Sequence, residues 1–194
     1  MAQLYPTDLY TLEEYARIRN EFRVRVIDHK KTRCLPIGPH VVLYFEDELT
    51  MQYQIQEMLR IERIFEPEGI QEELDVYNPL IPDGTNWKAT LMIEYSDEKE
   101  RKQALTQLID IEKAIWVQIQ GFENVRPIAN EDLQRTTEEK TSAVHFLRFE
   151  LTQEMIDSLR NGAHLSAGID HPAYHHTVKD LDSSVKASLL KDLH

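Results

Sequence analysis

The sequence predicts an α+β protein that folds as a single domain over residues 1–194, with helices packed on a mixed or antiparallel sheet. Its length suits one domain, and 41% hydrophobic with 29% charged residues is typical of a globular chain. Segments with helical and strand periodicity follow one another in the order α-β-α-α-β-α-β-β-β-α-β-α. Because strands joined by short connections outnumber β-α-β crossovers in this order, hairpin pairing is favoured over a parallel sheet.

The first helix is predicted at about 12–28, where the capping box of Thr11 and Glu14 precedes apolar residues at helical spacing. β-Branched and aromatic residues at 41–45 then predict a buried strand. A second amphipathic helix is expected at about 48–65, and the proline that follows it stops or breaks this helix.

A shorter helix through residues 70–76 is predicted to end at an Asn-Pro pair, because the residue before a proline avoids helical angles. Alternating apolar and polar residues at 87–95 predict a half-buried strand. Ser96 is the expected cap of the next helix, which carries apolar residues at 104–109. The period then changes to that of a strand at 115–119.

Gly162 is expected to end a helix in the last third of the chain, because glycine suits the left-handed conformation at a helix C-terminus. The elements predicted in this part are a hairpin strand at 125–128, a strand at 142–151, a helix capped by Thr152, a strand at 163–169 and a small helix at about 183–193.

The formal net charge of −12 predicts no nucleic-acid partner and no anionic membrane surface, since such binding neutralises phosphates with Lys and Arg. Seven cations between Arg17 and Arg33 are a local exception, which we interpret as a solvated helix face because no stacking aromatics lie among them. No stretch approaches the roughly 18 apolar residues of a spanning helix. The single cysteine, Cys34, and the lack of a signal-like N-terminal segment predict a cytoplasmic location.

The sequence contains no phosphate-binding glycine loop, dinucleotide-binding glycine pattern, G-x-S-x-G elbow or H-E-x-x-H motif. Enzymatic activity is less favoured for this reason. It stays open, because a site assembled from residues distant in sequence leaves no such motif.

His145 is the strongest local anomaly, because the predicted strand places it on an apolar face, opposite Arg148. The favoured interpretation is a neutral core histidine with a backbone or hydroxyl partner. The alternative is a ligand of a transition metal or haem, shared with His164 or His171 from a cluster of four histidines within 13 residues. His171 is the more defensible partner, since it follows the next predicted strand.

The second helix carries alternating carboxylates and cations, including Arg60 and Glu62. Ordinary ion pairing along the helix surface is the favoured explanation. Glu62 nevertheless approaches the apolar stripe, and a buried Glu–Arg pair there would mark a structural link or a pocket.

Apolar side chains on two-faced strands predict a homodimer. Trp87, Met92 and Trp116 have the positions of exposed residues, and a contiguous apolar surface favours contact with a second copy.

Four separated blocks carry a resemblance to a known family: ELTMQYQIQEMLRIER at 48–63, YNPLIPDGTN at 77–86, KTSAVHFLRF at 140–149 and DHPAY at 170–174. In type and order they resemble a bacterial family catalogued as domain of unknown function thirty-five hundred and one. The resemblance covers nearly the whole chain, and the family has no established activity to transfer. Blocks distant in sequence are expected to meet at a pocket, for which the candidate residues are Arg60, Glu62, Arg148 and Tyr174.

The resemblance also implies a context, because genes of this family are often found beside those of a rubrerythrin-like protein and an iron–sulfur protein. That context indicates peroxide, redox or iron handling. The first hypothesis is therefore a non-enzymatic accessory or interaction protein of a rubrerythrin-associated system, with one of these proteins as partner. The alternative is a metal- or haem-binding redox protein that uses the histidine ligands.

Overall fold

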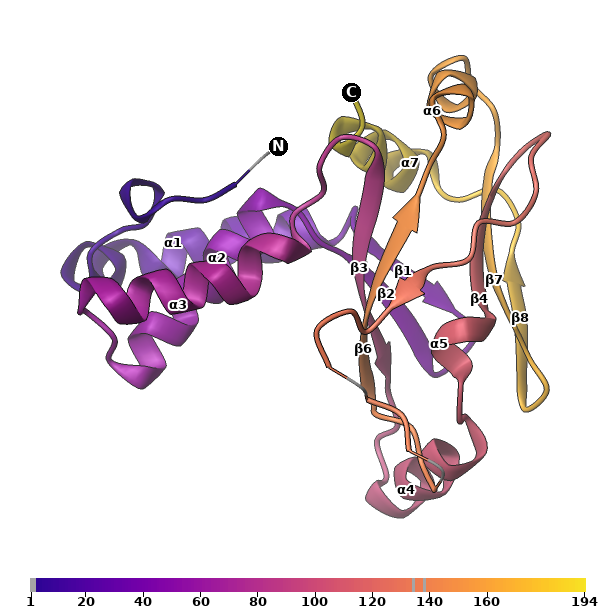
Figure 1. Ribbon diagram of the computed structural model, residues 1–194, viewed down its shortest axis with the longest axis horizontal. Coiled ribbons are helices and arrows are strands. Elements are labelled where there is room, and N and C mark those ends of the chain that lie inside the picture. Colours follow the sequence, from indigo (N-terminus) through magenta and orange to yellow (C-terminus); the bar gives the residue numbers. More distant parts are fainter. Residues whose placement is uncertain (1–2, 134, 138) are drawn as a thin grey trace.

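The computed structural model describes residues 3–133, 135–137 and 139–194, and it contains two sheets with helices around them (Figure 1). The predicted α+β class is confirmed, and all pairs of named strands run antiparallel. We call the helical segments at 6–30 and 48–80 the arm, and the sheets with their flanking helices the body. The arm projects from one side of the body (Figure 1).

The arm consists of η1 (Pro6–Asp8), α1 (Leu12–Lys30), α2 (Glu48–Glu62), α3 (Pro67–Tyr77) and η2 (Asn78–Leu80). The predicted capping box forms, since the hydroxyl of Thr11 accepts from the N–H of Glu14 and the carboxylate of Glu14 accepts from the N–H of Thr11. α2 ends at residue 62 instead of 65 because Arg63 adopts left-handed angles, with a φ of 55°. Pro67 begins α3, because proline fits the first position of a helix.

The arm has apolar clusters of its own, which hold its three long helices together. Glu57 on α2 joins it to α1, because its carboxylate accepts from Tyr15 Oη at 2.7 Å and from Arg19 Nε at 2.7 Å. The Arg19 guanidinium lowers the pKa of Glu57 to about 2. The buried apolar residues are Tyr15, Phe22 and Val26 of α1, Met51, Ile55 and Leu59 of α2, and Leu74 of α3.

The larger sheet contains β1 (Cys34–Ile37), β2 (Val41–Phe45), β3 (Asn86–Ile93), β6 (Val144–Glu150) and β5 (Ile128–Ala129), in the spatial order β1-β2-β3-β6-β5. Burial alternates along β2, β3 and β6, as expected for strands with one face toward the core. The inner face carries Leu43, Leu91 and Leu147, whereas the other face is half-buried.

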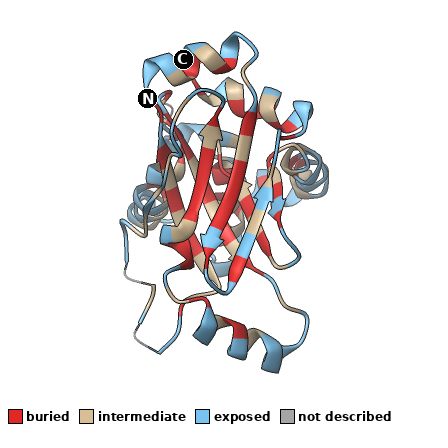
Figure 2. Ribbon diagram, turned by 90° about the vertical axis from the view of Figure 1, so that its right-hand side faces the viewer, coloured by how far each residue is buried: buried red, intermediate tan, exposed pale blue. Residues whose placement is uncertain are grey.

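The smaller sheet contains β4 (Ile115–Ile119), β7 (Leu165–His171) and β8 (Tyr174–Val178), in the order β4-β7-β8. Apolar residues of both sheets form one core, in which buried positions run along the strands and exposed ones lie mainly on helices (Figure 2). The remaining helices are α4 (Glu98–Gln107), α5 (Ile111–Ala114), α6 (Gln153–Arg160), α7 (Ser183–Leu189) and η3 (Leu190–Asp192). Within the described residues, no helix is both long and apolar enough to cross a membrane.

Two strands, β1 and β8, are not predicted from the sequence. β1 lies at a sheet edge, where Pro36 can be accommodated without losing a ladder hydrogen bond. β8 is an edge strand with polar, partly exposed residues, so it lacks the apolar alternation of a half-buried strand. The hairpin predicted between 115–119 and 125–128 forms only in part, because Val125 makes an antiparallel bridge with Val117 of β4 whereas β5 pairs with β6. In addition, Asp97 caps α4 in place of Ser96.

The two tryptophans do not form an exposed apolar surface. Trp87 is 1% exposed and donates from Nε1 to the carbonyl of Leu189 at 3.0 Å. Trp116 is 7% exposed, and its indole lies against Gly168, where an added Cβ would approach the ring to 2.3 Å. The expectation that both side chains are exposed is therefore wrong, which removes most of the basis for the predicted homodimer.

Candidate functional site

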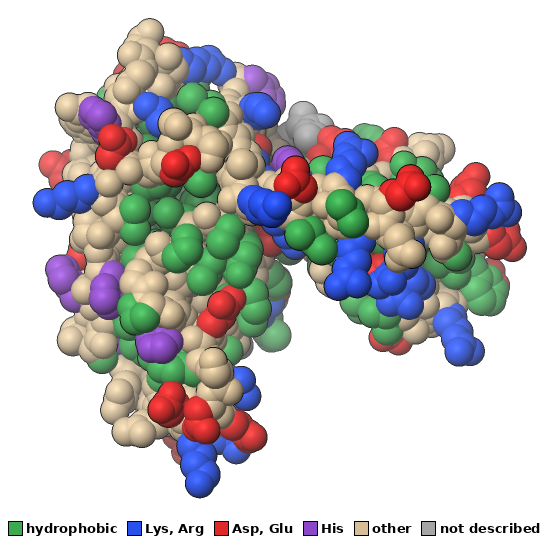
Figure 3. Space-filling model, turned by 180° about the vertical axis from the view of Figure 1, so that it is seen from behind, with side chains coloured by type: hydrophobic (Ala, Val, Ile, Leu, Met, Phe, Trp, Pro, Cys, Tyr) green, Lys and Arg blue, Asp and Glu red, His purple; other side chains and the backbone are tan. Residues whose placement is uncertain are grey.

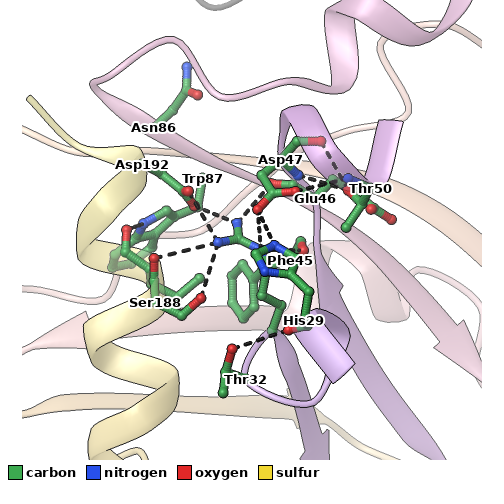
Figure 4. Close-up of polar contacts among 12 residues, drawn as sticks. His29, Thr32, Phe45, Glu46, Asp47, Thr50, Asn86, Trp87, Ser188 and Asp192 are labelled. Atoms are coloured by element: carbon green, nitrogen blue, oxygen red, sulfur yellow. Dashed lines mark hydrogen bonds and ion pairs between the residues drawn. The ribbon is translucent and has the colours of Figure 1, made fainter. Parts of the chain in front are cut away.

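A buried arginine, Arg33, joins the arm to the body in the segment between α1 and β1. Figure 4 shows the residues that surround it, among them Phe45, Asp47 and Asp192. Arg33 is 2% exposed, and its guanidinium donates to both carboxylate oxygens of Asp192, at 2.6 and 3.1 Å. It also donates to the carbonyls of Phe45 and Glu46, at 3.0 and 2.9 Å, and Nε lies 3.3 Å from Asp47 Oδ2. We call these five residues the Arg33 cluster. It ties the end of β2 and the start of α2 to the C-terminal segment.

Arg33 was expected to belong to a solvated helix face, and that interpretation is wrong. α1 ends at Lys30, so Arg33 no longer shares the exposed helix surface and turns into the junction. Burial raises the pKa of Asp192, although the Arg33 guanidinium acts in the opposite direction. Ordinary sequence patterns carry no signal for this pair, because its members are 159 residues apart.

The outer face of the larger sheet, turned away from the core, is only half-buried. Strand register aligns its side chains in three rows across β2, β3 and β6, which are Val42–Met92–Val144, Tyr44–Thr90–Phe146 and Glu46–Lys88–Arg148. The first row is apolar and the last is charged, so the polarity of this face increases toward the junction with the arm.

A groove with two chambers lies between this outer face and the arm. The inner chamber has a volume of about 450 Å³, and the outer chamber about 730 Å³, which is the size range of small-molecule sites. Tyr77, Leu80 and Phe146 line both chambers, so the two are adjacent. Figure 3 shows the arm projecting from the body with an open corner beneath it.

Glu46 lies in the inner chamber and is 6% exposed. Its Oε1 accepts from Thr90 Oγ1 at 2.7 Å, whereas the buried Oε2 has no hydrogen-bond partner in the described part of the chain. A buried acceptor without a donor costs about 1–3 kcal/mol. Glu46 is therefore the residue of the groove with the most to gain from a bound ligand.

The outer chamber is more highly charged. Arg148 donates to both carboxylate oxygens of Glu131, at 2.8 and 2.6 Å, and also pairs with Glu150. Lys88 forms no ion pair with any described residue, and burial together with the neighbouring Arg148 lowers its pKa. The arginine is thus fully engaged, while the half-buried lysine is available to a ligand.

Three of the four blocks on which the family resemblance depends meet at this groove. The block at 48–63 supplies Met51, the block at 77–86 supplies Tyr77, and the block at 140–149 supplies Phe146, each with further lining residues. The segments that make this chain resemble its family thus supply nearly half of the residues that line the groove.

The histidine that the sequence singles out, His145, lies on the inner face of β6 and is fully buried. Asn130 Nδ2 donates to its Nδ1 at 3.0 Å, and its Nε2 lies 2.9 Å from Thr141 Oγ1 and 3.0 Å from the carbonyl of Ser142. Burial lowers the pKa of His145. These contacts are those of a neutral imidazole with its proton on Nε2, donated to the carbonyl.

Glu112 lies behind this histidine and was not identified from the sequence. It is 3% exposed, and its Oε2 lies 4.0 Å from His145 Nδ1 without a hydrogen-bond partner among the residues described. It also lines a separate cavity of about 440 Å³ beside α5. A short, partly charged helix gives no pattern from which a buried carboxylate could be predicted.

A pH prediction follows from the burial of His145. His145→Gln should reduce the loss of stability between pH 7 and pH 5. The folded-state pKa lies below the unfolded value of about 6.5, so the unfolded chain binds more protons in this window and the free energy of unfolding decreases as the pH is lowered. Urea unfolding at both pH values measures this, with His175→Gln as an exposed control. An unchanged pH slope in His145→Gln would contradict a desolvated imidazole.

The three histidines proposed as metal ligands have separate partners. His171 Nε2 lies 2.9 Å from the carbonyl of Ile109, and His164, which is exposed, lies 2.8 Å from Asp180. Among the described residues, no hydrogen bond joins His145 to either of them. In residues 3–133, 135–137 and 139–194 no three His, Cys, Asp or Glu side chains are grouped as a metal site.

Of the four pocket candidates, only Arg148 lines the groove. Arg60 and Glu62 lie on the exposed surface of α2, where Arg60 pairs with Glu57 at 3.2 Å. Tyr174 is buried in the body, and its hydroxyl contacts the backbone between β1 and β2. The structure therefore does not bring these four residues together.

Comparison with known proteins gives a family without an assigned activity. A crystal structure of a novel protein of unknown function from Burkholderia pseudomallei K96243 is similar, with 52% identity, 100% coverage of both chains and a TM-score of 0.94. The search of curated proteins finds no match. The profile of a protein family of unknown function, DUF3501, matches residues 3–193. The chain therefore belongs to the DUF3501 family.

Proposed function

We propose that this chain is a non-enzymatic accessory protein whose groove binds a small organic ligand. We further propose that it serves the redox or iron-handling system of the rubrerythrin-like and iron–sulfur proteins named above. The observation that carries the proposal is the meeting of three family-like blocks at one groove, beside Glu46, whose Oε2 has no hydrogen-bond partner among the residues that the structure describes.

The chemistry of the groove favours binding over catalysis. The inner chamber is lined mainly by apolar side chains. In the outer chamber, the guanidinium of Arg148 forms ion pairs with Glu131 and Glu150. Concave sites with apolar walls and few polar groups are typical of ligand binding. The alternative, a metal- or haem-binding redox protein, has less support because His145, His164 and His171 each contact a different set of groups.

Filling the groove should abolish ligand binding. Val144 is half-buried on the outer face and lines the inner chamber, so Val144→Trp places an indole in the space that a ligand would use. The dye 8-anilinonaphthalene-1-sulfonate serves as an apolar probe. Its fluorescence increases on binding, and a titration of that increase gives its affinity. We expect the affinity of Val144→Trp for the dye to be at least about tenfold lower than that of the native chain.

Val24→Trp is the matched control, because Val24 is 67% exposed on α1 and lies outside the groove. Equal dye binding by Val144→Trp and the native chain would contradict the proposed site. The redox setting has its own test, which is co-elution of the purified chain with the rubrerythrin-like protein in size-exclusion chromatography. Separate elution would count against that partner.

A further inference from the structure

We propose that the inner chamber binds a free α-amino acid with an apolar side chain, with its ammonium group at Glu46 and its carboxylate at Lys30. This inference rests on the proposed function and names the class of ligand. It follows from the two charged groups that line the inner chamber and from the apolar character of its walls.

Glu46 is held in place from several directions. Its backbone N–H donates to the carbonyl of Lys88 at 2.8 Å, and its own carbonyl accepts from Arg33 Nη2 at 2.9 Å. Thr90 fixes Oε1, which leaves the buried Oε2 without a donor among the described residues, on a side chain that lines the chamber. A ligand ammonium would form a charge-assisted hydrogen bond with this oxygen, which is stronger than a bond between neutral groups.

Lys30 supplies the complementary charge. It is the last residue of α1, lines the same chamber and forms no ion pair with the residues that the structure describes, Glu46 included. A ligand with an ammonium group alone would bring a second cation beside Lys30, and a carboxylate alone would leave Glu46 Oε2 unpartnered. Both groups together satisfy both side chains, so charge complementarity favours a zwitterion.

The other lining residues determine which type of ligand side chain fits the chamber. Most of them are apolar, and two are methionines, whose flexible side chains adapt to ligands of different shape. A volume of about 450 Å³ accommodates a single amino acid. The apolar residues that contribute are Met51, Leu80, Met92, Val144 and Phe146.

Isothermal titration calorimetry with L-leucine tests the inference directly. Two analogues each lack one charged group: 4-methylpentanoate has no ammonium, and 3-methylbutylamine has no carboxylate. We expect L-leucine to bind and each analogue to bind at least about tenfold more weakly. An analogue that binds as tightly as L-leucine would overturn the zwitterion, as would an absence of binding by L-leucine, L-methionine and L-phenylalanine.

The variants Glu46→Gln and Lys30→Met locate the site. Each should weaken L-leucine binding at least about tenfold, whereas Glu62→Gln, on the exposed surface of α2, should leave it unchanged. Circular dichroism verifies that Glu46→Gln remains folded, and Lys30→Met tests the same chamber from a partly exposed position. Unchanged binding by both variants would overturn the inference. Dye binding that responds to Val144→Trp without any amino-acid binding would leave the proposed function standing.

Discussion

Replacing Arg33 with methionine is expected to lower the free energy of unfolding by about 3–5 kcal/mol. The substitution keeps an unbranched side chain but leaves the buried carboxylate of Asp192 without its cation and the carbonyls of Phe45 and Glu46 without donors. Breaking one side of a buried ion pair costs this much because the remaining charge stays desolvated. Urea unfolding followed by circular dichroism measures the change.

Arg25→Met is the control for this prediction, because Arg25 is exposed on α1 and should change stability by less than about 0.5 kcal/mol. A loss below about 1 kcal/mol in Arg33→Met would contradict the role of the Arg33 cluster. Amide exchange gives a second measure. Because Arg33 anchors Asp192, the amides of α7 and η3 should exchange faster in the variant than those of β3.

Tyr174→Phe is expected to lower the free energy of unfolding by about 2 kcal/mol or more, although it removes only one oxygen atom. The Tyr174 hydroxyl accepts from the N–H groups of His40 and Val41, at 2.9 and 3.1 Å, and donates to the carbonyl of Ile37 at 2.8 Å. Phenylalanine would leave these three backbone groups without that partner in a buried setting. Urea titrations give the change in the free energy of unfolding, and thermal unfolding gives the matching change in melting temperature.

Tyr95→Phe is a suitable comparison, because Tyr95 is half-buried and stacks on His40, while its hydroxyl forms no hydrogen bond with the described residues of the turn. A loss in Tyr174→Phe no larger than in Tyr95→Phe would show that the hydroxyl does not hold the β1–β2 turn. Such a result would also reopen a ligand-binding role for Tyr174.

Local patterns account for most of the secondary structure that the sequence predicts correctly. The capping box of Thr11 and Glu14 marks the start of α1, and Thr152 caps α6, because capping depends only on residues within one turn. The alternation along β3 also holds, since its inner face is buried. The edge strands β1 and β8 are not predicted, because their pairing depends on partners elsewhere in the chain.

The functional residues are harder to predict, because their environment depends on contacts between distant segments. His145 is placed correctly on an apolar strand face, and Arg148 on the opposite face. Glu46 and Lys88 give no sequence signal, since nothing local shows that one carboxylate oxygen is buried or that this lysine is half-buried. The family-like blocks indicate the right region of the fold but not the right side chains within it.

Methyl NMR of the methionines tests the central claim, that the groove is a binding site, most directly. The chain has five methionines, of which Met51 and Met92 line the inner chamber, whereas Met58 and Met155 line neither chamber. With methyl-labelled protein, titration with 8-anilinonaphthalene-1-sulfonate should shift the signals of Met51 and Met92 and leave those of Met58 and Met155 in place. Shifts confined to Met58 or Met155, or no shift at saturating dye, would contradict the account.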